Sequence, residues 1–208
     1  MNINTNYNYP NHNHTNFKAI QVKLNKQSPT IQKYLSTTNN TPEQIITAQK
    51  ELERLVECVR HDINRHTIRS IIQKRHPEVA GKYVSDYNYK WDFFTNNPEL
   101  TLNLVHDENV VGLSNKLNIY LTNDEEQVLI AEGTVPIYDS PAKQLAHNLR
   151  YYINPKFSIF GDNEDYIKFF SKMLDKSPEY TAFAEKINNE IAEKKSEVSK
   201  NISDWFNQ

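Results

Sequence analysis

The chain has 208 residues, of which 38% are hydrophobic and 24% are charged, which fits one globular domain with extensions. Its lone cysteine excludes an internal disulfide and a cysteine-based zinc site. The sequence contains no run of about 18 apolar residues, the length that a membrane-spanning helix needs. Its four glycines are isolated, which argues against phosphate-binding loops of the P-loop, Rossmann and kinase types.

The net charge of −2 is unevenly placed: residues 1–91 hold 13 Lys/Arg against 7 Asp/Glu, and residues 92–208 hold 11 against 19. This split favours a basic face that meets an anionic partner, and two solvated surfaces are the alternative.

Residues 1–40 are predicted to form a polar leader and linker. Residues 1–16, an asparagine-rich tract, predict a disordered tail whose two histidines make no metal site. Residues 17–24 alternate apolar and polar side chains and predict a short strand or, in a secreted protein, a chaperone-bound segment; residues 25–40 predict a linker. No acidic residue precedes Glu43. This acid-free, Asn/Ser/Thr-rich stretch resembles the secretion signals of bacterial type III effectors, which implies a translocated virulence protein.

A long amphipathic helical region follows in residues 41–77. It opens with Thr-Pro-Glu-Gln, which combines a capping box with a proline at the first helical position. Apolar residues then recur every three or four positions as far as Ile63, but Ile68, Ile71 and Ile72 fall out of phase with them. The phase change predicts two helices that bury opposite faces, with a break near Asn64 and an end at Pro77.

Four stretches in the middle of the chain alternate apolar and polar residues and are separated by short polar turns. They cover residues 87–93, 100–104, 117–121 and 128–138. The first carries an aromatic face made of Tyr87, Tyr89 and Trp91. Consecutive strands with short turns are typical of an antiparallel meander.

The rest of the chain is predicted to be helical. Helices open at Ser140, at Asp162 and at Ser177, and the last runs towards Phe206. The predicted fold is therefore α+β: N-terminal helices, a central antiparallel meander of about four strands and C-terminal helices. Residues 41–208 form its single domain, behind the leader of residues 1–40.

The densest basic cluster of the chain lies within the helical region of residues 41–77, and it gives the predicted partner-binding residues Arg54, Arg65, Arg69, Lys74 and Arg75. Such a face suits an acidic protein surface, the phosphates of nucleic acid or lipid headgroups, and a solvated helix is the alternative. The aromatic row Tyr87, Tyr89 and Trp91 is a second candidate contact face, although aromatic strand faces usually pack in a core.

Cys58 is the one possible thiol nucleophile, with His61 and Asp62 a turn away on the same helix. Its place in mid-helix, away from the N-terminal dipole that lowers a thiol pKa, argues against catalysis. One short helix also cannot easily arrange a nucleophile, a base and an orienting group around a substrate carbonyl. The sequence therefore assigns no catalytic residue, metal or cofactor.

Three hypotheses of function follow. The first is a translocated bacterial effector that binds or modifies a host protein through the basic helical face, with a secretion chaperone as a further partner. Delivery by a type IV system is a variant of it, because a Glu/Lys/Ser-rich helix ends in Trp205 and Phe206. The second is a small phage or bacterial regulatory module that docks on protein or nucleic acid. The third is a transferase or hydrolase whose site is assembled from residues distant in the sequence.

Overall fold

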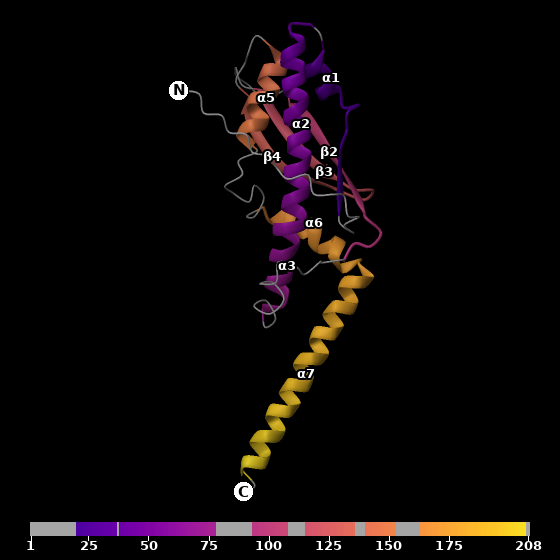
Figure 1. Cartoon of the computed structure of the whole chain (residues 1–208), viewed down its shortest axis with the longest axis vertical. Helices are drawn as coiled ribbons and strands as arrows, with labels where there is room; N and C mark the ends of the chain where they lie inside the picture. Colours follow the sequence, from indigo (N-terminus) through magenta and orange to yellow (C-terminus); the bar gives the residue numbers. More distant parts are fainter. Residues whose placement is uncertain are drawn as a thin grey trace.

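The computed structural model of the chain describes residues 20–36, 38–77, 93–107, 115–135, 140–152 and 163–206 (Figure 1). The predicted α+β class is confirmed: helices precede and follow a four-stranded sheet, and no helix of the described residues is long and apolar enough to cross a membrane. The elements are β1 (Gln21–Leu24), α1 (Pro29–Leu35), α2 (Pro42–Asp62), η1 (Ile63–Thr67), α3 (Ile68–Arg75), β2 (Glu99–Asp107), β3 (Asn115–Thr122), β4 (Gln127–Val135), α5 (Pro141–Tyr152), α6 (Glu164–Asp175) and α7 (Pro178–Phe206).

The sheet is mixed, which corrects the prediction of a purely antiparallel meander. Its strands lie in the order β1-β2-β3-β4; β2, β3 and β4 are antiparallel neighbours, but β1 runs parallel to β2. A parallel neighbour needs a long crossover connection, and here the segment that holds α1, α2, η1 and α3 provides it. The predicted aromatic strand with Tyr87, Tyr89 and Trp91 lies outside the described residues.

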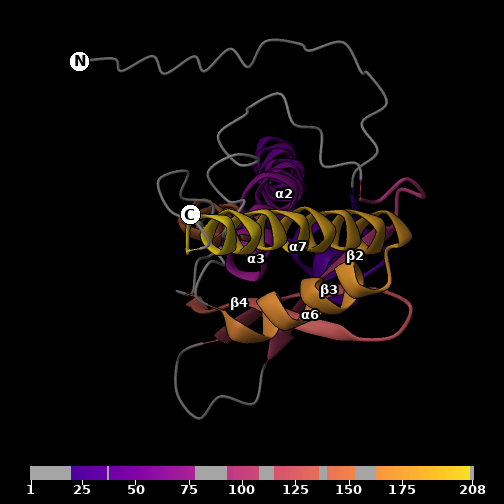
Figure 2. The same cartoon turned by 90° about the horizontal axis from the view of Figure 1, so that it is seen from below.

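One face of this sheet forms the core. The alternating residues predicted as apolar are all buried in the structure, with exposed fractions of 1% or less: Leu100, Leu102, Leu104, Leu117, Ile119 and Leu121. Helix α2 packs against β1 and α5, and α5 also contacts α1 and β4. The view from below places α2 on one side and β3 and β4 on the other (Figure 2). The core is therefore a helical layer on one face of a twisted sheet.

Residues 25–40 do not form a linker as predicted. They contain α1, whose Ile31 and Tyr34 are buried in the main core. Pro29 opens this short helix, and the hydroxyl of Ser28 donates a hydrogen bond to the carbonyl oxygen of Leu104 at 2.9 Å. Together with β1, which pairs with β2 and has Ile20 and Val22 buried at its start, the helix places residues from Ile20 onward inside the fold.

The two predicted helices of residues 41–77 are one continuous helical run. The capping box is confirmed: the Gln44 amide donates to the Thr41 hydroxyl, and the Thr41 amide donates to the Gln44 side chain. The phase change is absorbed by the π-helical turn η1, in which the amide of Ile68 donates to the carbonyl of Ile63. A π turn holds one residue more than an α turn, so Ile68 stacks on Ile63 and the buried stripe stays on one side. The prediction of opposite buried faces was therefore wrong, although the junction was correctly located.

Two of the three C-terminal helices start where local signals predicted. Helix α5 follows Ser140, and α7 follows Ser177. The predicted cap of α6, Asp162, lies outside the described residues; the observed cap is Asn163, whose side chain accepts the amide of Tyr166 at 3.1 Å. Helix α7 contacts α6 near its start and then leaves the body, so that the C-terminus lies far from the sheet (Figure 1).

Candidate functional site

The π turn is fixed on its inner side by two sets of hydrogen bonds. The Asn64 side chain accepts the amide of Ile20 at 3.1 Å and donates to the carbonyl of the same residue at 3.0 Å, which ties the turn to the start of β1. Buried Asp62 accepts from the hydroxyls of Thr67 at 3.1 Å and Tyr166 at 3.3 Å. Burial, and then the charge of Asp62, raise the pKa of Tyr166 well above its ordinary value, so the tyrosine stays a hydrogen-bond donor. These hydrogen bonds fix the position of the turn and therefore of the side chains on its solvent-facing side.

The outer side of the same turn is basic. Arg65, His61 and His66 are all exposed there, and the two histidine rings lie 5.8 Å apart. The pKa of His61 is lowered, first by partial burial and then by the positive charges of Arg65 and His66. The positive electrostatic potential that lowers the pKa of this histidine would attract an anion to the same surface.

The predicted basic residues fall into two groups in the structure. Arg54, Arg65, Arg69 and Lys74 lie along the continuous helix, exposed except for half-buried Arg69; we call these four residues the outer basic row. Arg54 forms an ion pair with Glu51 at 3.5 Å, and Glu51 in turn accepts from the Nε of Arg150 at 2.6 Å. Arg65 and Lys74 have no hydrogen bond or ion pair to any residue of the described ranges.

Arg75 forms the second group and is engaged within the fold. Its guanidinium binds both carboxylate oxygens of Asp175, at 2.5 and 3.2 Å, and lies 5.5 Å from the centre of the Tyr180 ring. The bond to Asp175 is the largest cause that raises the pKa of Arg75. These contacts join the end of α3 to α6 and α7, which gives Arg75 a structural role; its contact with a partner stays a prediction.

Cys58 has the environment of a packing residue. It is half-buried against the main core, and burial raises the pKa of its thiol. His61 and Asp62 do not converge with it on one site, since His61 is exposed and Asp62 is buried against Thr67 and Tyr166. A raised thiol pKa is the opposite of what nucleophilic cysteines need.

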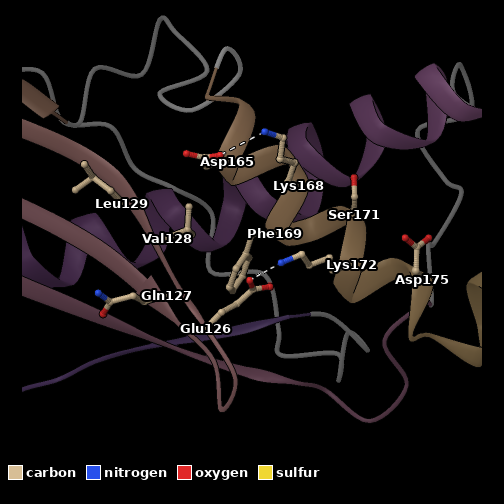
Figure 3. Close-up of a pocket in the computed structure, with 10 residues that line it drawn as sticks. All are labelled: Glu126, Gln127, Val128, Leu129, Asp165, Lys168, Phe169, Ser171, Lys172 and Asp175. Carbon is tan, nitrogen blue, oxygen red and sulfur yellow. Dashed lines mark hydrogen bonds and ion pairs between the residues drawn. The ribbon is translucent and has the colours of Figure 1, made fainter.

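A shallow pocket of about 460 Å³ lies between the start of β4 and α6 (Figure 3). Its charged side chains already bind one another: Lys172 donates to Glu126 at 2.6 Å, and Lys168 lies 3.6 Å from Asp165. Asp175, at one end of the pocket, is occupied by Arg75. A charged ligand would therefore have to break existing ion pairs, which makes this pocket a weaker candidate than the outer basic row.

Within the described ranges, no group of three or more His, Cys, Asp or Glu side chains could hold a metal ion. Comparisons with models of protein families, with curated proteins and with solved structures found no match. The residue that sequence reasoning missed is Glu51, whose buried carboxylate links Arg54 to Arg150 on α5. No sequence signal indicates that Glu51 and Arg150, which lie 99 positions apart in the chain, form an ion pair.

Proposed function

We propose that the chain is a protein-binding module whose outer basic row contacts an acidic surface of another protein. The observation that supports it most is the pair of exposed cations, Arg65 and Lys74, which have no acid partner among the described residues. Folded proteins usually scatter both signs of charge, so uncompensated cations on a rigid helix favour an anionic partner. The π turn supports the proposal, because such turns are frequent at functional sites.

An acidic protein fits this surface better than nucleic acid. The whole chain has a net charge of −2 and an isoelectric point near 6.4, whereas domains that bind nucleic acid through phosphates are typically strongly basic. Helix α2 also exposes Glu53 and Glu57 beside its arginines. Mixed charges of this kind select a partner with a matching pattern and would repel a continuous phosphate backbone.

The test is a charge reversal on the row. We expect Arg65→Glu with Arg69→Glu to weaken binding to a labelled Asp/Glu-rich peptide about 100-fold in fluorescence anisotropy, while thermal stability stays nearly unchanged. The control is Lys26→Glu with Lys200→Glu, which makes the same charge change at exposed positions away from the row. Equal loss in the control, or tighter binding of a 20-base-pair DNA duplex than of the peptide at physiological salt, would refute the proposal. A large loss of stability in the row variant would show instead that these arginines are structural.

The place of action belongs to the same proposal: a translocated effector that acts in a host cell and is delivered with the help of a chaperone. Its support is the composition of residues 1–40, which lack acidic side chains and are rich in Asn, Ser and Thr. A reporter fused to these residues should leave a bacterium that has a type III apparatus and stay inside a strain whose apparatus is disabled. Retention in both strains would remove the delivery part of the proposal and leave the binding part intact.

A further inference from the structure

Helix α7 carries one apolar stripe that is buried at its start and uncovered at its end. Tyr180 and Ile187 are buried, with exposed fractions of 6% and 1%. Further along the same face the exposed fractions rise, to 56% for Val198, 53% for Ile202 and 71% for Trp205. Figure 1 shows this part of the helix projecting away from the sheet and from α3. Exposed apolar surface of this size on one helical face usually marks a docking site.

The stripe repeats every seven residues. Apolar side chains stand at Ala184, Ile191, Val198 and Trp205, and acidic side chains stand one position before the last three of them, at Glu190, Glu197 and Asp204. A seven-residue period keeps one face towards a second helix when the two helices wind around each other, whereas a lone helix has a period of 3.6. In heptad letters the apolar residues occupy position a and the acids position g. The occupant that this pattern fits is another helix.

We propose that α7 pairs with α7 of a second copy of this chain as a parallel, in-register coiled coil. The charges specify the orientation. In a parallel pair, a g residue meets the e residue five positions further along the other helix, so Glu190 meets Lys195 of the second copy. An antiparallel pair would place the acidic row against the same row of the other helix. β-Branched residues such as Ile191 and Val198 are the residues that two-stranded coiled coils prefer at position a.

A lipid surface fits the helix less well. Helices that lie on membranes carry Lys and Arg along their polar face, which meets anionic headgroups. Here the flank of the apolar stripe is acidic, with Glu190, Glu197 and Asp204 spaced one heptad apart. The acidic flank would be repelled by an anionic membrane and is neutralised only in part by Lys194 and Lys195.

The pair should be weak. The inward d positions that follow Ile187 hold Lys194 and Asn201, and polar residues at inward positions fix the register at a cost in stability. Side chains of this size bury roughly 100–200 Å² each, so Val198, Ile202 and Trp205 from both copies bury on the order of 1,000 Å². That area lies at the lower limit for a specific interface, and with polar residues at two d positions we expect a dissociation constant in the micromolar to millimolar range.

Sedimentation equilibrium of the full chain tests the pairing. We expect the average mass to rise from 24.4 kDa towards twice that value as the concentration increases from about 10 µM to about 1 mM. Glu190→Lys should abolish the rise, and adding Lys195→Glu to it should restore the rise, because the reversed pair is again complementary. Ser196→Lys, on the opposite face of α7, is the control and should leave the rise unchanged. A chain that stays monomeric at the highest concentration, or a double variant that fails to dimerise, would overturn the proposal.

Disulfide cross-linking tests the orientation. In a Cys58→Ser background, Ile191→Cys and Trp205→Cys should each form a covalent dimer under mild oxidation, because equal a positions face each other in a parallel pair. In an antiparallel pair centred on Val198, each of these positions would lie about 21 Å along the axis from its own counterpart in the second copy, so neither could cross-link to itself. Failure of either variant to cross-link refutes the parallel register. Co-sedimentation with phosphatidylglycerol vesicles, if the Val198→Lys change abolished it, would assign the stripe to a membrane instead.

Discussion

The π turn leads to a prediction about deletions in the long helix. Removing one residue from a regular α-helix rotates everything after it by about 100°, whereas removing the extra residue of a π turn restores a regular helix without changing that phase. His66 is exposed within the π turn, and Glu57 is exposed in the middle of α2. We therefore expect deletion of His66 to be tolerated and deletion of Glu57 to unfold the protein.

The magnitude follows from burial. Five aliphatic residues after Glu57 have exposed fractions of 3% or less, and they are Val59, Ile63, Ile68, Ile71 and Ile72. At about 1.5–3 kcal/mol for each buried side chain, turning them out of the core costs on the order of 10 kcal/mol, as much as the whole stability of a typical domain. Deletion of His66 keeps the three aliphatic residues that follow it, Ile68, Ile71 and Ile72, on the same face and keeps Thr67 beside Asp62. Its cost should stay near 1–2 kcal/mol, the strain of shortening the helix by about 1.5 Å.

Urea unfolding followed by circular dichroism measures both variants. The His66 deletion should shift the midpoint modestly with an unchanged slope, and the Glu57 deletion should show no cooperative transition. Substituting His66 with Ala is the control for loss of the side chain alone. If the two deletions were equally destructive, the π turn would not be the element that keeps the two halves of the helix in phase.

Two further predictions concern single side chains. Arg75→Ala should lower the free energy of unfolding by about 1 kcal/mol, because it removes a solvent-exposed but bidentate bond to Asp175 and the contact with the Tyr180 ring. Arg60→Ala removes a single exposed ion pair and should cost less than about 0.5 kcal/mol; equal costs in urea unfolding would contradict the structural role of Arg75. In the folded protein, Cys58 should react with iodoacetamide at pH 8 about tenfold more slowly than glutathione does, because burial raises the pKa of its thiol. In guanidinium, where the protein is unfolded, Cys58 should react as fast as glutathione. If the folded protein already reacted as fast as glutathione, the thiolate would be accessible and the reasoning would be wrong.

Local signals predicted the fold well where the structure depends on neighbours in the chain. The capping box at Thr41 and the helix starts after Ser140 and Ser177 each rest on contacts within a few residues, and each was found in place. The alternating strands around Leu102 and Ile119 were found for the same reason. Side chains that alternate between core and solvent need no distant information to be recognised.

The parallel pairing of β1 with β2 could not be read in this way. Val22 lies beside Leu100, and the hydrogen bonds between these strands depend on how the intervening helices pack back on the sheet. A strand of four residues between polar segments carries too little pattern to indicate a partner. Helix α1 was missed because a helix of seven residues spans two turns, and its stripe of Ile31 and Tyr34 is too short to distinguish from a polar loop.

The candidate site shows the same limit. Counting helical phase at a constant 100° located the junction near Asn64 but gave the wrong direction for Ile68, because a π turn cannot be recognised from residue types alone. Arg65 and Arg75 look equivalent in the sequence. Their difference comes from Asp175, a hundred residues further along the chain, which binds Arg75 and leaves Arg65 to solvent. Only the fold decides which cations of a basic cluster remain available.

The fold also explains part of the charge asymmetry between the two halves of the chain. Part of that difference is neutralised inside the molecule, since Arg75 from the basic half binds Asp175 from the acidic half. Among the described residues, charges without an ion pair lie on separate surfaces: cations such as Arg65 on the long helix, and the acids Glu197 and Asp204 on α7. The first surface has the sign and rigidity for an acidic partner, and the second has a seven-residue repeat that needs another helix.

A parallel pair of α7 helices would hold the two folded domains at the same end of the coiled coil. Two outer basic rows would then be available to a partner with repeated acidic sites, which binds such a pair more tightly than a single row because the second contact is intramolecular.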